Sequence, residues 1–160
     1  MDTRRIPLSS AQIVDDDVAA VVRALRSGRV AMGPEIRGFE EELAAVAGVR
    51  HAVACSSGTA ALHMALLALG VGEGDVVLTT PFSFVASSNV ILMVGAVPVF
   101  VDIDPDTLCP SPEELRRTIG ALRRGEFRFP HGAPVPPDRL KALLLVDVFG
   151  LPAPWEQYEA

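Results

Sequence analysis

Residues 55–66, CSSGTAALHMAL, place small hydrogen-bonding side chains between a short apolar run and a strong helical pattern. Ser57, Gly58 and Thr59 stand where that helix should begin. The first amides of a helix have no partner inside the helix, and the helix dipole adds positive potential there. A glycine allows close backbone approach, so this turn has the groups that hold a phosphate. A plain capped turn would use the same residues, and neither a P-loop nor a GxGxxG motif is present.

Two further segments could bind a ligand at the same edge of the fold. The run TTPFSFVAS, residues 79–87, carries Phe82 and Phe84, and one of these rings could stack on a flat ring. Both could equally be core residues, and we expect one of them to be. Asp102 and Asp104 follow another apolar run, where we favour loop capping over direct ligand binding. The sequence shows no local set of side chains sufficient for a metal.

The elements that must position these residues alternate between strands and helices. We expect strands at 52–55, 76–79, 97–101 and 141–146, the last buried on both faces. We expect helices at 14–26, 34–46, 59–69, 83–94 and 111–123. The pattern predicts an α/β fold with three α/β/α layers and a mostly parallel sheet. Ligands bind such sheets outside the carboxyl ends of the strands, where the three segments above lie.

Local signals refine this outline at a few positions. Ser111 and Glu114 have the spacing of a capping box at the start of the helix at 111–123. Four prolines lie between Arg124 and Arg139, which indicates an irregular surface loop at 124–139. Cys55 ends a predicted strand, so we expect it to be a small core residue.

Composition excludes several classes of function. The chain has 160 residues and a net charge of −6, which disfavours nucleic acid and anionic membrane as partners. We interpret the basic cluster of the fifth helix as a solvated face; it consists of Arg116, Arg117, Arg123 and Arg124. Two cysteines cannot form a disulfide framework, and no run of residues suits a signal peptide or a membrane span, so we expect a cytoplasmic protein.

The order of these motifs resembles the nucleotide-sugar aminotransferases of the DegT/StrS family, which are fold-type-I enzymes that use pyridoxal 5′-phosphate (PLP). The likeness runs from SGTAAL through GDVV and the proline-aromatic segment to GAVPVFVDI, and it includes VDVFGLPA at residues 146–153. It implies an enzyme that moves an amino group from an amino-acid donor, commonly glutamate, onto a keto-sugar nucleotide. It also implies a homodimer. Only the proline-rich loop departs clearly, as an apparent insertion.

The resemblance implies a role for six residues of this chain. Gly58 and Thr59 would bind the cofactor phosphate, with Ser57 beside them. Phe84 would stack on the pyridine ring and Ser87 would line the same pocket. Gly33 lies in the segment where the family approaches the sugar substrate.

Two family features have no counterpart in these 160 residues. They are the aspartate that pairs with the pyridine nitrogen and the lysine that forms the Schiff base, and both would lie beyond Ala160. Asp147 belongs to an upstream segment, and Lys141, the sole lysine, should begin a strand at the far end of the sheet. We therefore assign no catalytic residue to this chain.

We expect the chain to be the N-terminal part of an aminotransferase. Residues 1–48 would form a helical segment and residues 49–160 a partial PLP-binding large domain, with the C-terminal small domain absent. Alone it should be inactive. A non-catalytic truncated homologue and a generic phosphate-binding α/β domain are the alternatives.

Overall fold

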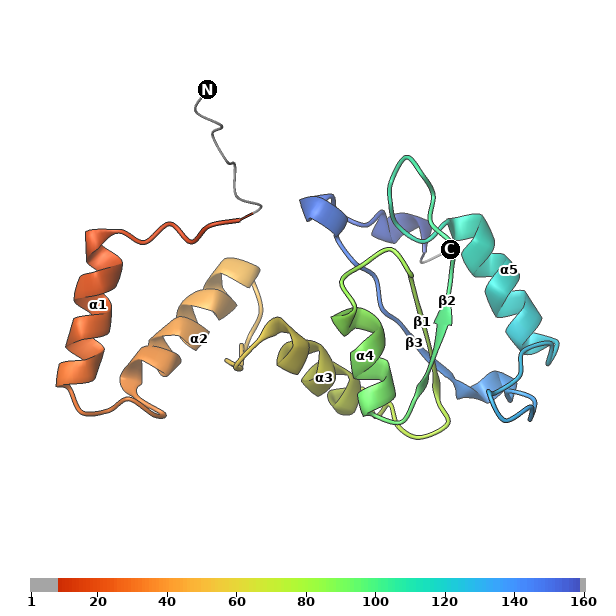
Figure 1. The fold of residues 1–160 in the computed structure, drawn as a ribbon, viewed down its shortest axis with the longest axis horizontal. Coiled ribbons are helices and arrows are strands. Elements are labelled where there is room, and N and C mark those ends of the chain that lie inside the picture. Colours follow the sequence, from red (N-terminus) through yellow and green to blue (C-terminus); the bar gives the residue numbers. More distant parts are fainter. Residues whose placement is uncertain (1–8, 159–160) are drawn as a thin grey trace, which may run out of the picture. The chain divides into compact units, whose positions relative to one another are not determined.

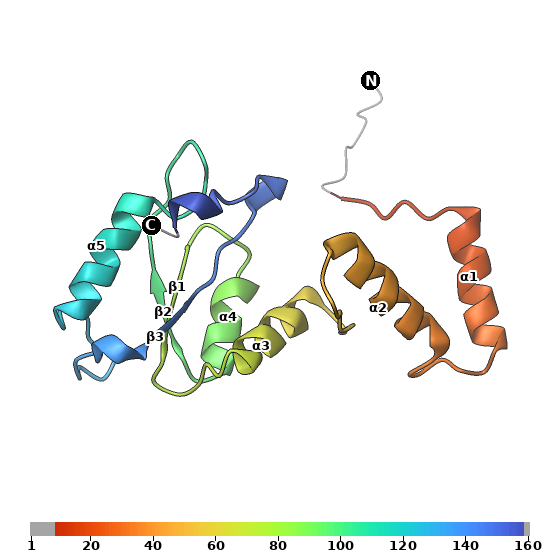
Figure 2. The same cartoon turned by 180° about the vertical axis from the view of Figure 1, so that it is seen from behind.

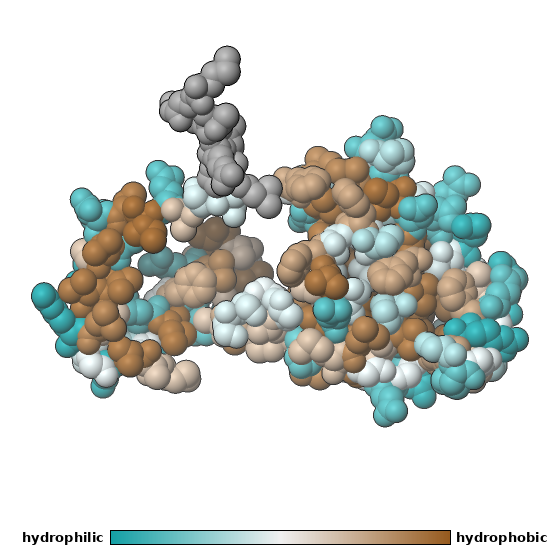
Figure 3. Space-filling model, viewed as in Figure 1, coloured by the Kyte–Doolittle hydropathy of each residue, from teal (hydrophilic) through white to brown (hydrophobic). Residues whose placement is uncertain are grey.

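The computed structural model describes residues 9–158, and the chain divides into two compact units, Met1–Ala54 and Cys55–Ala160. The first unit contains helices α1 (Asp15–Arg26) and α2 (Pro34–Ala47). The amide of Val14 donates to the Asp17 carboxylate over 3.0 Å at the start of α1. Gly48 ends α2 in the left-handed conformation that suits glycine, with φ of 67°. Neither helix contains a buried residue, and Figure 3 shows apolar side chains open to solvent along α1.

The second unit is built on a parallel sheet in the order β2-β1-β3 (Figure 1). Its strands are β1 (Val76–Thr79), β2 (Val97–Phe100) and β3 (Leu140–Leu143). Val76 at the start of β1 aligns with Val97 on one side and Leu140 on the other. The central strand β1 is fully buried, with exposed fractions of 0–1%.

Helices cover both faces of this sheet. α3 (Gly58–Ala68) and α4 (Ala86–Met93) pack on one face, where Leu66, Val90 and Ile91 join Val77 in a buried cluster. α5 (Pro112–Arg123) covers the other face, where Leu115 and Leu122 pack against β1 and β2 (Figure 2). This arrangement confirms the predicted α/β class with its three layers.

The strand predicted at 52–55 is not formed. The backbone there has no neighbouring strand, and the amide of Ala54 donates instead to the Glu40 carboxylate of α2 over 2.8 Å. Cys55, expected in the core, is exposed for the same reason. A strand needs a partner to satisfy its backbone, and local sequence cannot supply one.

Two other elements are shorter than predicted. β3 ends at Leu143, and its residues are half-buried or exposed rather than buried on both faces. The strand order explains this, since β3 lies at an edge of the described sheet. Helix α4 starts at Ala86 instead of 83, because Ser83–Val85 form a turn before it.

The segments around α5 are partly as predicted. The Ser111 hydroxyl accepts from the Glu114 amide as expected, but the Glu114 carboxylate binds Arg117 over 2.9 Å and does not complete the capping box. The loop at 124–139 is irregular up to Pro136, with a single bridge from Arg128 to Pro134, and it ends in a short 3-10 helix at Pro137–Arg139. It is not purely a surface loop, since Val135 is buried. Apolar side chains of the loop pack on the same face of the sheet as α5.

Candidate functional site

The start of α3 is the first component of the site. α3 has 11 residues, a length of about 16 Å, and it leads through the turn at 70–75 into the start of β1. Ser57 is the N-cap, and its hydroxyl oxygen accepts from the Ala60 amide over 3.1 Å. The hydroxyl hydrogen stays available to donate to a ligand.

The two residues after this cap have amides free for a ligand. Within residues 9–158, neither the Gly58 amide nor the Thr59 amide donates a hydrogen bond to the protein. A Cβ built on Gly58 would meet no atom within 4 Å, so open space lies in front of the helix start. Free amides, a hydroxyl and open space at a helix N-terminus fit a phosphate group such as that of PLP.

The loop after β1 is the second component. Thr80 is buried, and its hydroxyl oxygen accepts from the Phe82 amide over 3.0 Å. Phe84 has its carbonyl bound by the Ser83 hydroxyl over 3.0 Å and by the Ser87 amide over 3.1 Å. Its ring is nevertheless 79% exposed, and Phe82 is 42% exposed. The expectation that one of these phenylalanines is a core residue was wrong, so both rings are free to meet a ligand.

α4 brings the two components to the same side of the sheet. It begins just after the loop that leaves the carboxyl end of β1, and it packs against α3. Ser87 lies in its first turn and is 6% exposed. Phe84 and Ser87 therefore lie just beyond the carboxyl end of β1, as in other parallel α/β sites, while Ser57, Gly58 and Thr59 begin a helix that packs against α4 on the same face of the sheet.

Gly33, the sixth candidate, belongs to the first unit. It is the N-cap of α2, and a Cβ there would lie 2.5 Å from the Arg29 carbonyl oxygen. The fold itself therefore requires glycine at this position. Sequence reasoning missed this packing requirement because Arg29 and Gly33 meet only once the turn before α2 is formed.

The acidic residues after β2 have structural roles, as expected. The Asp104 carboxylate accepts from the amides of Asp106 and Thr107 over 2.8 and 3.1 Å. The Asp102 carboxylate accepts from the neighbouring Ile103 amide over 2.9 Å. Both side chains are occupied in holding their own loop, which is the usual use of aspartate in a turn.

Cys109 lies beside this loop and is fully buried. Burial, with a smaller contribution from the Asp147 carboxylate, raises the pKa of its thiol. A buried neutral thiol is unreactive, since the thiolate is the nucleophile.

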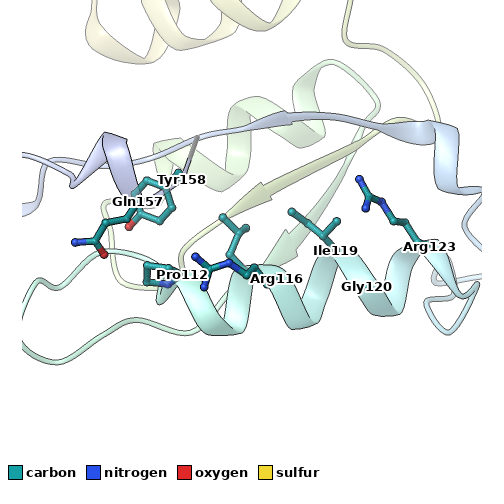
Figure 4. A pocket seen from close by; sticks show the side chains of 8 residues that line it. Pro112, Arg116, Ile119, Gly120, Arg123, Gln157 and Tyr158 are labelled. Carbon is teal, nitrogen blue, oxygen red and sulfur yellow. The ribbon is translucent and has the colours of Figure 1, made fainter. Parts of the chain in front are cut away.

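A groove of about 280 Å³ lies between α5 and the segment that ends at Tyr158 (Figure 4). Arg116 and Arg123 line it, while Arg117 and Arg124 pair with glutamates. All four arginines are exposed, as predicted for a solvated face. This groove sits against α5, across the sheet from α3 and α4, so it is separate from the candidate site.

None of the helices described at residues 9–158 is long and apolar enough to span a membrane.

Known proteins resemble this chain in sequence. The spore coat polysaccharide biosynthesis protein SpsC of Bacillus subtilis (strain 168) is 43% identical over 114 residues, which cover 71% of this chain and 29% of SpsC.

Solved structures of aminotransferases also resemble this chain. An aminotransferase from Psychrobacter cryohalolentis matches with a TM-score of 0.78 and 32% identity over 96% of this chain and 35% of its own. NtdA from Bacillus subtilis, solved with bound cofactor PMP, matches with a TM-score of 0.70 and 29% identity over 91% of this chain and 31% of its own. The chain thus spans about a third of the length of these relatives. The model of the DegT/DnrJ/EryC1/StrS aminotransferase family matches residues 11–160, and the chain belongs to this family.

Proposed function

We propose that this chain is the N-terminal portion of a PLP-dependent aminotransferase acting on a keto-sugar nucleotide, with an amino-acid donor such as glutamate. Residues 1–48 would be its N-terminal helical segment and residues 49–160 part of its cofactor-binding domain. Family membership supports the reaction class. The polysaccharide role of SpsC supports a sugar substrate, and the PMP bound to NtdA supports the cofactor.

The open helix start at Gly58 is the observation that carries the proposal. The amides of Gly58 and Thr59 and the Ser57 hydroxyl would hold the cofactor phosphate, and the exposed ring of Phe84 would stack on the pyridine. Ser87 would line the pocket beside that ring. When bound, PLP supplies an electron sink for the carbon that loses or gains the amino group. The residues of this chain orient the cofactor by its phosphate and ring.

Covalent chemistry on the cofactor would need groups other than those described above. Lys141 is exposed and is the second residue of β3, close to the amino edge of the sheet. We therefore expect its amine to lie too far from a cofactor stacked on Phe84, beyond the carboxyl end of β1. We propose that the 160-residue chain alone does not transfer amino groups.

We also propose a homodimer as the working assembly. The apolar side chains left open along α1 and α2 suit contact with more protein; they include Val18, Val21, Leu25 and Phe39. Light scattering should show self-association of the purified chain. A monodisperse monomer at high concentration would argue against the assembly.

Gly58→Ala tests the cofactor site. Because no atom lies within 4 Å of the new Cβ, the fold should accept alanine and gain about 0.4–1 kcal/mol from a less flexible unfolded chain. The same methyl group fills the space before the helix start, so binding of PLP should fall. Equilibrium dialysis should show weak PLP binding by the unaltered chain, and pyridoxal, which lacks the phosphate, should bind less.

Gly38→Ala is the matched control. Gly38 is also helical, within α2, and its Cβ would also meet nothing within 4 Å. This variant should gain stability and keep PLP binding unchanged. If Gly58→Ala binds PLP as well as the unaltered chain does, or pyridoxal binds as well as PLP, the turn is not the phosphate site.

A further inference from the structure

Phe149 adopts a backbone conformation that its side chain disfavours. Its φ and ψ are 56° and 21°, in the left-handed region. A residue with a Cβ atom enters this region only where surrounding contacts impose it, and such positions gather at functional sites. Its ring is also 90% exposed, so burial of the ring does not compensate for the strain.

The segment around Phe149 is firmly held at both ends. Val148 is 8% exposed and Ala153 is 5% exposed. The Asp147 carboxylate accepts from the Ala153 amide over 2.9 Å, and the Gly150 amide donates to the Asp147 carbonyl over 3.1 Å. The exposed ring is therefore presented by an anchored loop, and Asp147 positions that loop.

Phe149 meets Phe82 at the carboxyl edge of the sheet. The ring centroids are 6.3 Å apart and the rings are nearly perpendicular, at 77°. This edge-to-face geometry is the favoured one for aromatic pairs. One ring follows β1 and the other follows β3, and these strands are neighbours in the sheet. The pair thus presents two neighbouring aromatic rings at the edge where ligands bind such sheets.

We propose that Phe149 is a specificity-determining residue whose ring, backed by Phe82, contacts a ring of the acceptor substrate. This inference rests on the proposed function, in which Phe84 already stacks on the ring of the cofactor. The flat face of a nucleotide base and the C–H face of a sugar both suit an exposed aromatic ring, and the experiment below distinguishes these two sources.

Phe149→Asn is the informative variant. Asparagine tolerates the left-handed conformation but has no aromatic ring. The melting temperature should stay the same or rise by about 2–4 °C as the strain is relieved. The substrate ring should bind roughly tenfold more weakly. Phe149→Tyr should restore ring binding.

Saturation-transfer NMR on the full chain gives the readout. The probes are uridine 5′-diphosphate and glucose 1-phosphate, inorganic phosphate is added as a competitor for their shared phosphate group, and PLP binding is measured separately by dialysis. Saturation transfer to the base protons or to the sugar protons should be seen with the unaltered chain and lost in Phe149→Asn. That result supports the proposal, and the protons affected identify which substrate ring contacts Phe149. Phe100→Asn is the matched control, since Phe100 is a half-exposed phenylalanine at the end of β2, two strands from β3.

The outcomes separate this inference from the proposed function. If PLP binds but ring saturation is the same in Phe149→Asn, or falls equally in Phe100→Asn, the inference is wrong and the function stands. If neither PLP nor any ring binds, both are wrong. A large fall in melting temperature for Phe149→Asn would show that the ring serves folding, and would also overturn the inference.

Discussion

Replacing Thr79 by valine should lower the free energy of unfolding of the unit that contains the sheet by about 1 kcal/mol. Thr79 is the last residue of β1 and is 0% exposed. Its hydroxyl donates to the Leu144 carbonyl over 3.0 Å, across 65 positions of sequence. This hydrogen bond joins the carboxyl ends of β1 and β3, the edge on which the candidate site is built.

The magnitude follows from what valine changes. Valine has nearly the same shape as threonine but cannot donate, so the Leu144 carbonyl loses this partner in a buried setting, at a cost of about 1–3 kcal/mol. The added methyl group is buried and returns roughly 0.8 kcal/mol. The net loss is therefore roughly 0.2–2 kcal/mol, centred near 1 kcal/mol, and the hydrogen bond outweighs the gain in apolar burial.

Urea unfolding followed by tryptophan fluorescence measures this change. The chain has one tryptophan, Trp155, which lies in the same compact unit as the sheet. With a slope of about 2 kcal/mol per molar urea, the midpoint should fall by roughly 0.5 M.

Thr79→Ser gives the control, because it keeps the hydroxyl and removes the methyl group. If the hydrogen bond dominates, serine should be tolerated better than valine. A midpoint for Thr79→Val equal to that of the unaltered chain, or a larger loss in Thr79→Ser than in Thr79→Val, would refute the reasoning.

Three further results are expected in the same unfolding assay. Ser57→Ala removes the cap that binds the Ala60 amide, so the free energy of unfolding should fall by about 1 kcal/mol; no change would show that the cap is unimportant. Leu78→Ala, at a side chain 1% exposed in β1, should cost about 2–5 kcal/mol, and a loss below 1 kcal/mol would contradict its central packing. The raised pKa of Cys109 means that the native state holds the thiol proton more tightly, so stability present below about pH 8.5 should be lost as pH rises further; Cys109→Ala should flatten this alkaline decline.

Helix positions could be predicted because their signals are local. Pro34 begins α2 and Ser111 caps α5, each as the sequence indicated, and Gly48 ends α2 in the left-handed conformation. A cap or a left-handed glycine acts within one turn of backbone, so no knowledge of distant residues is needed. The α/β class followed from the alternation of such helices with apolar runs.

Strand behaviour was harder to predict because it depends on distant partners. The runs at 52–55 and 141–146 are similarly apolar, yet only the second pairs with a neighbour, and it stays at an edge. The exposure of Phe82 and Phe84 could not be predicted from the local sequence either, since an apolar residue after a strand is more often buried. The six residues assigned to cofactor and substrate remain predictions.

Residues that the fold does not require are the most informative about ligands. Gly33 is explained by its own packing, because a side chain would strike the Arg29 carbonyl, so it says little about substrate. Gly58 has neither a left-handed backbone nor a crowded Cβ, and Phe149 is both strained and exposed. Selection for stability alone favours alanine at the first position and glycine or asparagine at the second. Under the proposed function, a ligand gains from the space at Gly58 and from the ring at Phe149, neither of which stability alone requires.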